Sequence, residues 1–91
     1  MADIIAIRKD AVDAATKAVE FDDKEEYEEA AKCYIKAAEK LTYLSKIDEN
    51  TYNKDTYRKK AMEYCERARK LKEAVDNKES QKQPVASGGG G

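Results

Sequence analysis

The amino-acid sequence predicts an all-α fold, an antiparallel bundle of three helices, on three observations. Residues 1–83 of the 91-residue chain contain neither glycine nor proline, the two residues that interrupt helices most strongly. Apolar side chains recur at intervals of three and four residues over three long stretches, which is the period of a helix with one buried face. Only short polar segments separate these stretches, so consecutive helices must run in opposite directions.

The first predicted helix covers about residues 3–22. Asp3 is a suitable N-cap, because its carboxylate can accept hydrogen bonds from the free amides of the first turn. The side chains expected to face the core are Ile4, Ile7, Ala11, Ala14 or Ala15, Ala18 and Phe21. Because alanines dominate this stripe, a neighbouring helix can approach closely.

The second predicted helix covers about residues 24–47. Acidic residues crowd its first turn, where negative charge suits the positive end of the helix dipole. These acidic residues are Glu25, Glu26, Glu28 and Glu29. The apolar stripe expected to face the core consists of Tyr27, Ala30, Tyr34, Ala37, Leu41 and Leu44.

The third predicted helix covers about residues 53–77 and follows a polar loop near residues 48–53, where asparagine and threonine favour turns and caps. Its apolar residues are alternately four and three positions apart, the spacing of a heptad stripe. They are Tyr57, Ala61, Tyr64, Ala68, Leu71 and Val75. Met62 and Cys65 form a second, narrower stripe beside the first.

Residues 1–77 are predicted to form one small domain, and residues 78–91 a flexible, glycine-rich linker or tail. This organisation is typical of an N-terminal module taken from a longer protein, so we expect that a downstream part is missing. The four closing glycines are either natural linker or an artificial addition, and the sequence does not separate these alternatives.

The composition argues against several kinds of chemistry. The chain has no histidine, which rules out histidine-based triads, histidine-ligated metal sites and an imidazole pH switch. Cys33 and Cys65 lack CxxC partners, so we expect buried, reduced thiols of a cytosolic protein and not a zinc site or redox pair. No serine or cysteine stands beside a plausible base, and no phosphate-binding loop occurs. We therefore predict no catalytic residue, no metal and no cofactor.

Two charged runs have functional interpretations, which we weigh against simple solvation. Residues 20–29 hold seven carboxylates and one lysine but lack the glycine of a calcium loop, so a solvated corner is favoured. Residues 54–72 carry eight basic and three acidic side chains, a pattern that suits anionic lipid or nucleic acid. The net charge of the chain is nevertheless −1, and a solvent-exposed helix face is favoured here too.

A binding module is the function class that remains. An amphipathic helix of a partner can lie in the groove between two helices of a bundle, with its apolar anchors one turn apart. Met62 and Cys65 stand beside the core stripe of the third helix, so we expect them to line such a groove. The alternative is that they are ordinary core periphery.

Two patterns carry a resemblance to a known family. One runs through the first two predicted helices as Ala11-x6-Ala18-x3-Asp22-x4-Tyr27-Glu28-Glu29-Ala30-x3-Tyr34-x2-Ala37-x3-Leu41. The other lies in the third as Arg58-x-Lys60-x3-Tyr64-x2-Arg67-Ala68-x-Lys70-Leu71-Lys72. Over about residues 5–76 the chain resembles the MIT (microtubule-interacting and trafficking) domain, and is nearest to members at the N-terminus of AAA ATPases that disassemble ESCRT-III polymers.

The resemblance implies a three-helix bundle that binds the C-terminal tails of ESCRT-III subunits. One class of tail motif lies as a helix between the second and third helices, and another lies extended between the first and third. The implied residues of the former groove are Leu44, Lys60, Ala61, Met62, Cys65, Glu66 and Arg69. The implied residues of the latter groove are Ala15, Ala18 and Val19.

Two positions depart from the family pattern. Cys65 stands where the family uses a leucine anchor, which makes the pocket shallower. Arg69 stands where the family often has an acid that pairs with an arginine of the partner, and two arginines repel each other. Either the partner motif differs in charge, or the groove between the first and third helices is the main one.

The implied role is to recruit a parent AAA ATPase from the cytoplasm to ESCRT-III filaments at endosomal membranes, with only indirect membrane contact and no nucleic acid. We expect a monomeric fragment and a parent that forms an oligomeric ring. Three alternatives stay open. They are an MIT domain of another parent (a deubiquitinase, a calpain-like protease, a kinase or spastin), a tetratricopeptide-like scaffold, and an anionic-lipid binder that uses residues 54–72.

Overall fold

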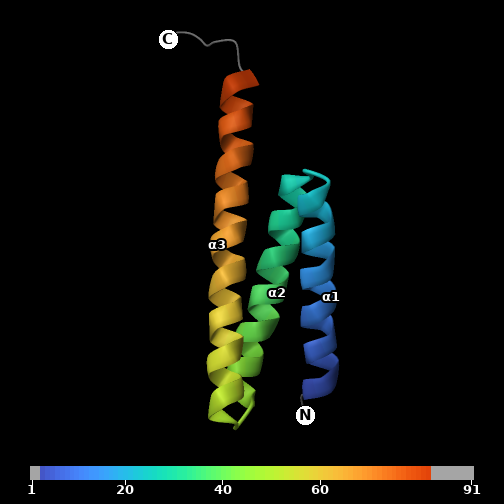
Figure 1. Cartoon of the computed structure of the whole chain (residues 1–91), viewed down its shortest axis with the longest axis vertical. Helices are drawn as coiled ribbons and strands as arrows, with labels where there is room; N and C mark the ends of the chain where they lie inside the picture. Colours follow the sequence, from blue (N-terminus) through green and yellow to red (C-terminus); the bar gives the residue numbers. More distant parts are fainter. Residues whose placement is uncertain (1–2, 83–91) are drawn as a thin grey trace.

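The computed structural model describes residues 3–82, with side chains through residue 77, as a bundle of three α-helices. The helices are α1 (Ile4–Asp23), α2 (Tyr27–Ile47) and α3 (Thr51–Lys82). In Figure 1, α1 and α3 run in the same direction and α2 runs opposite to both. No strand occurs in the described part of the chain, and the predicted fold class is confirmed.

The first helix begins where the sequence predicted. One carboxylate oxygen of Asp3 accepts hydrogen bonds from the backbone amides of Ile5 at 3.1 Å and Ala6 at 3.3 Å. These bonds satisfy amides that have no partner inside the helix, so Asp3 is the N-cap. The helix ends at Asp23, one residue later than predicted.

A tight corner between α1 and α2 makes α2 begin three residues later than predicted. The amide of Glu26 donates to the carbonyl of Phe21 at 2.9 Å, and the amide of Glu25 donates to that of Asp22 at 3.0 Å. This bond pair is a Schellman motif, which requires a left-handed residue at its turning point. Glu25 takes that conformation with φ of 64°. Glycine usually fills this position, so the sequence carried no sign of the stop.

The corner between α2 and α3 is also shorter than predicted. The side chain of Asp48 accepts a hydrogen bond from the amide of Asn50 at 2.9 Å, and that of Asn50 accepts one from the amide of Asn53 at 3.1 Å. Asn50 therefore caps α3, which starts at Thr51 and not at residue 53.

The third helix continues to Lys82, five residues past its predicted end, and rises beyond the α1–α2 corner (Figure 1). The prediction of flexible linker is therefore wrong for residues 78–82, which contain neither glycine nor proline. The rest of the predicted linker, residues 83–91, lies outside the described residues.

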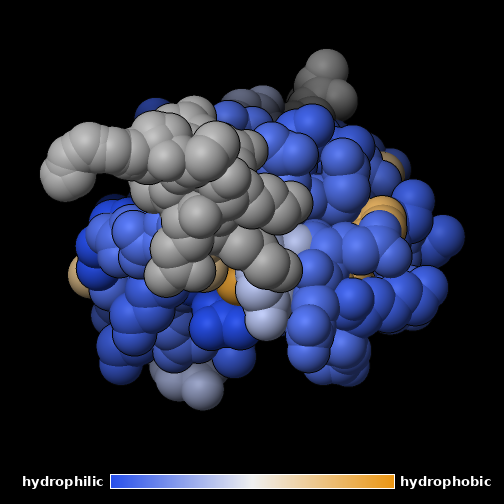
Figure 2. All heavy atoms as spheres, turned by 90° about the horizontal axis from the view of Figure 1, so that it is seen from above, coloured by the Kyte–Doolittle hydropathy of each residue, from blue (hydrophilic) through white to orange (hydrophobic). Residues whose placement is uncertain are grey.

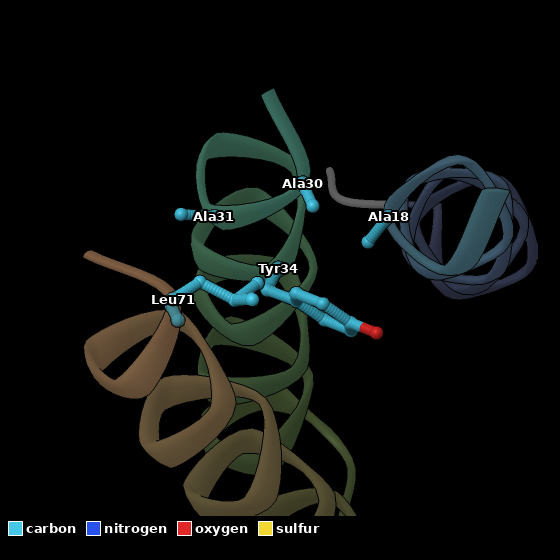
Figure 3. Packing of buried hydrophobic residues seen from close by; sticks show 6 residues of the cluster. Ala18, Ala30, Ala31, Tyr34 and Leu71 are labelled. Atoms are coloured by element: carbon cyan, nitrogen blue, oxygen red, sulfur yellow. The ribbon is translucent and has the colours of Figure 1, made fainter. Parts of the chain in front are cut away.

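The core consists mainly of alanine. One buried cluster joins all three helices and contains Ala18, Ala30, Ala31, Tyr34, Ala68 and Leu71. In Figure 3, Ala18 of α1 faces Ala30 of α2, whereas Leu71 of α3 lies against the other side of α2 near Ala31. The predicted stripes are confirmed, because their members are buried or half-buried throughout.

The second helix packs against both neighbours, whereas α1 and α3 stay apart. No Cα atom of α1 lies within 8 Å of one in α3 among the described residues. Large side chains lie on this side, including Tyr34 and Tyr64, whose ring centroids are 5.7 Å apart. The side chain of Tyr34 extends from α2 toward the side that α1 and α3 share (Figure 3).

Glu25→Gly is expected to stabilise the domain. A left-handed residue other than glycine costs about 1–2 kcal/mol, part of which the larger unfolded-state entropy of glycine offsets, so the net gain is about 0.5–1 kcal/mol. Thermal unfolding followed by circular dichroism should show a melting temperature higher by about 2–8 °C. Glu25→Ala is the matched control, since it removes the carboxylate and keeps the backbone cost. An equal gain in both variants would assign the effect to charge.

Ala30→Leu is expected to destabilise the domain by about 1–3 kcal/mol, because the added methylenes have no room where α1 crosses α2. Ala30 has no exposed surface. Urea unfolding measures the change, and Ala6→Leu, on the exposed surface of α1, is the control that should stay near wild type. Wild-type stability of Ala30→Leu would mean that the crossing is more open than described.

Candidate functional site

The face between α1 and α3 carries a groove, here called the α1/α3 groove, that encloses about 480 Å³. It is lined by Arg8, Ala11, Val12, Ala15, Thr16 and Val19 of α1, Leu41 of α2, and Thr56, Tyr57, Lys60 and Tyr64 of α3. Val12 is 62% exposed and Val19 47% exposed, although both are aliphatic. Such unburied apolar walls in a concave surface favour an apolar ligand.

A polar cluster bridges α1 and α3 at the end of the groove near the start of α1. The Nε atom of Arg8 donates to the hydroxyl of Tyr57 at 2.8 Å, and that hydroxyl donates to Asp48 at 3.3 Å. The guanidinium of Arg8 also lies 3.5 Å from the Asp48 carboxylate. The pKa of Asp48 is lowered, first by the hydrogen bond from the amide of Asn50 and then by that from Asn53.

A second polar bridge joins the other end of α1 to α3. The Nε and Nη2 atoms of Arg67 donate to the two carboxylate oxygens of Asp22 at 2.8 and 2.7 Å. The hydroxyl of Tyr34 donates to the same carboxylate at 3.1 Å. The pKa of Asp22 is lowered, chiefly by the hydrogen bonds from Arg67, and partial burial of Asp22 opposes this shift.

The face between α2 and α3 carries another groove, here called the α2/α3 groove, of about 590 Å³. It is lined by Thr42, Ser45 and Lys46 of α2 and by Arg58, Ala61, Met62, Cys65, Glu66 and Arg69 of α3. Along α2 it continues into a hollow of about 410 Å³ that Ile35 and Tyr43 also line. Met62 is 72% exposed, so this groove also presents uncovered apolar surface.

The predicted residues of the α2/α3 groove divide into three groups. Five of them, Ala61, Met62, Cys65, Glu66 and Arg69, lie together along α3 and line it. Leu44 was placed there wrongly, because it is fully buried in the core. Lys60 was also placed wrongly, because its position on α3 faces α1 and it lines the α1/α3 groove.

The predicted residues of the α1/α3 groove are partly in place. Ala15 and Val19 line it, but Ala18 is fully buried against α2 and was placed wrongly. The prediction omitted Arg8 and Val12, although both follow a spacing of four, three and four residues with Ala15 and Val19. Each residue of this stripe directly follows a residue of the core stripe in the sequence. That regular offset could have identified them.

The two cysteines differ in exposure. Cys33 is half-buried beside the core, but Cys65 is exposed, so the expectation of two buried thiols is wrong for Cys65. Among the described residues no group of three or more histidine, cysteine or acidic side chains could hold a metal ion. No helix in that part of the chain is long and apolar enough to span a membrane.

Ion pairs within α3 involve three of its basic side chains, Arg58, Lys60 and Arg69. Arg69 pairs with Glu66 and, at 2.6 Å, with Glu73, and it lowers the pKa of Glu66. Lys60 lies 3.7 Å from Glu63. Viewed along the bundle, the surface is mostly hydrophilic with scattered apolar residues (Figure 2).

Comparison with known proteins agrees with the resemblance seen in the sequence. The family model of the MIT (microtubule interacting and transport) domain matches residues 9–73, which include the lining residues of both grooves except Arg8. The chain belongs to the MIT domain family. It is 37% identical over 89 residues to vacuolar protein sorting-associated protein 4 of Dictyostelium discoideum, an alignment that covers 98% of the chain and 20% of that relative. This MIT domain thus spans about a fifth of that relative, and no solved structure matches it.

The Asp22–Arg67 pair is expected to make the stability of the folded domain fall as the pH is lowered into the acidic range. Because the pKa of Asp22 is lowered on folding, its contribution is fully present above the unfolded aspartate value of about 3.9 and is lost as the pH falls through the folded value. Asp22→Asn should cost about 1–2 kcal/mol at pH 7 and much less near pH 2. Thermal unfolding across this range measures the difference.

Asp23→Asn is the matched control, because Asp23 is the exposed neighbour at the same helix end. It should follow the wild-type profile within error. A difference between Asp22→Asn and wild type that stays constant from pH 7 to pH 2 would contradict the ionic origin of the stabilisation.

Proposed function

We propose that this MIT domain is a non-catalytic docking module that binds C-terminal tails of ESCRT-III subunits and recruits a longer AAA ATPase to them. Membership of the family and similarity to a vacuolar protein sorting-associated protein 4 support this assignment. The two grooves supply surfaces of the required shape, since each has apolar walls left open by the packing of the helices.

The α1/α3 groove is the principal docking site in this proposal. The observation that carries it is an apolar lining with two cations, Arg8 and Lys60, and no acidic side chain among the described residues that line it. Both cations also have carboxylate neighbours outside the lining, Asp48 at 3.5 Å from Arg8 and Glu63 at 3.7 Å from Lys60, so a tail carboxylate shares them. An apolar tail segment covering Val12 and Val19 removes their side chains from water, which contributes about 25 cal/mol per Å² of apolar surface. Carboxylates flanking that segment complement the cations.

The α2/α3 groove is secondary in this proposal because of its charges. Its acidic lining residue Glu66 is already paired with Arg69, and Glu39 lies in the adjoining hollow along α2. An arginine on a partner helix therefore meets a carboxylate that is neutralised and a guanidinium that repels it. This arrangement disfavours the α2/α3 groove for tails that carry basic residues beside their apolar anchors, and the cations of the α1/α3 groove suit tails that carry acidic ones.

Weak binding by a single module suits this role. A ring of parent subunits presents several MIT domains to one filament, so that many weak contacts add up to strong attachment. Each single contact can still dissociate and re-form. In this proposal the parent works in the cytoplasm, and the domain brings it to filaments on endosomal membranes. The ATPase activity belongs to the downstream part of the parent.

Binding to anionic lipid is the weaker alternative. Of the eight basic residues between positions 54 and 72, Arg58, Lys60, Arg67 and Arg69 each pair with a carboxylate of the chain. These internal pairs reduce the charge available to a membrane. This observation counts against binding to anionic lipid. A simple test remains, because binding of that kind falls steeply as the salt concentration rises.

NMR titration of the isotope-labelled chain with tail peptides of ESCRT-III subunits tests the proposal. We expect amide signals of α1 and α3 around Ala15, Val19 and Lys60 to shift. Val19→Asp places a charge on the apolar wall and should weaken binding by about tenfold or more, since one buried aliphatic side chain contributes about 1.5–3 kcal/mol.

Cys65→Asp is the matched variant in the α2/α3 groove. Both substituted side chains are exposed, so both variants should keep wild-type melting temperatures, and Cys65→Asp should bind nearly as well as wild type. Loss of binding in Cys65→Asp alone would move the principal site to the α2/α3 groove. If no tail peptide shifts any signal while anionic vesicles or RNA do, the docking function is wrong.

A further inference from the structure

Small side chains let α1 and α3 each pack closely against α2, but α1 and α3 stay apart from each other. This separation needs a physical cause. Apolar surfaces of adjacent helices attract, and packed helix axes usually lie 8–10 Å apart. Here the two helices do not approach within 8 Å between Cα atoms in the described residues. Polar bridges connect them at both ends, through Arg8, Tyr57 and Asp48 at one end and through Asp22 and Arg67 at the other.

The place of Asp22 in its helix indicates a tertiary role. It lies in the last turn of α1, where a negative charge opposes the helix dipole at a cost of about 0.3–1 kcal/mol. That turn contains no basic residue to offset it. The partner of Asp22 is instead Arg67, 45 positions along the chain on another helix.

The geometry of the Asp22–Arg67 pair constrains the distance between α1 and α3, in addition to joining the two helices. Two parallel hydrogen bonds of 2.8 and 2.7 Å set both the distance and the orientation of the guanidinium and the carboxylate. The hydroxyl of Tyr34 holds the same carboxylate from α2. The carboxylate is thus tied to all three helices at one height of the bundle.

Asp22 and Arg67 are not among the residues that line either groove. Arg8 and Tyr57, in the opposite bridge, do line the α1/α3 groove and would touch its occupant. Only the Asp22–Arg67 pair therefore allows the spacing of the helices to be changed without changing the surface that a ligand contacts.

We propose that Asp22 and Arg67 are positioning residues that hold α1 at a fixed distance from α3 and so set the width of the α1/α3 groove. The importance of that width rests on the proposed function, but the geometric effect does not. Without the pair, α1 is held at this end only by its contacts with α2, and its distance from α3 shifts and varies more widely.

Distance measurements between spin labels test the proposal on the whole 91-residue chain. The native thiols are removed by Cys33→Ala and Cys65→Ala, and labels are attached at Lys17→Cys and Lys70→Cys, exposed positions of α1 and α3. A second pair at Lys36→Cys and Lys70→Cys reports the spacing of α2 and α3. Pulsed electron–electron double resonance gives the distance distribution for each pair.

Arg67→Gln should shift and broaden the distribution between α1 and α3 and leave that between α2 and α3 unchanged. Arg67→Lys keeps the charge but loses the bidentate geometry, so it should give an intermediate broadening. The double exchange Asp22→Arg with Arg67→Asp restores an ion pair and should return the distribution toward wild type. Rescue of this kind would not follow if Arg67 acted only through general stability.

Unchanged distributions in both single variants of Arg67 would overturn the proposal. Broadening of both label pairs together would also overturn it, since that pattern means general loosening of the bundle. These outcomes are independent of the proposed function, because no ligand is present. Failure of tail peptides to bind the native chain would instead count against the docking role and leave the distance result as it stands.

Discussion

The packing of α2 against both neighbours through alanine is the constraint on which the rest of the structure depends. Ala30 and Ala31 face α1 and α3 from opposite sides of α2 (Figure 3), and Ala37 and Ala38, seven residues further along α2, are also buried. Small side chains bring the backbones together, so α2 is covered on two sides by its neighbours. A domain of this size buries limited surface, and close helix contacts are how it obtains a continuous core.

The third side of the bundle follows from that arrangement. With α1 and α3 both drawn onto α2, the space between them is filled by tyrosine rings and by long polar arms, not by alanine. Tyr34 and Tyr57 contribute apolar area and also donate a hydroxyl hydrogen to Asp22 and Asp48 respectively. The outcome is a partly filled face with a floor of apolar side chains, in contrast to the closed contacts around α2.

The two grooves share α3 and differ in chemistry. On the side toward α1, this helix presents Tyr57, Lys60 and Tyr64, and its charge there is positive. On the side toward α2, it presents Met62 and Cys65 beside the paired Arg69 and Glu66. One helix therefore contributes to two grooves of unequal polarity, and Tyr57 and Tyr64 belong both to a groove and to the core stripe.

The sequence by itself determined the helices, their order and their buried stripes. Absence of glycine and proline and a steady spacing of three and four residues depend only on local geometry, and the resemblance of the chain identified its family. The sequence pattern misplaced a helix boundary at the α1–α2 corner. There Glu25 takes the left-handed backbone conformation that glycine usually adopts. The capping of α3 by Asn50 likewise moved a boundary by two residues.

The tertiary structure alone decided which apolar residues are core and which are groove. Ala15 and Ala18 belong to one helix and one residue type, yet Ala15 lines the α1/α3 groove and Ala18 is fully buried. Periodicity places a residue on a face but does not tell how close the next helix comes to that face. Contacts between residues far apart in the chain, such as Asp22 with Arg67, join the helices there, and no local spacing encodes them.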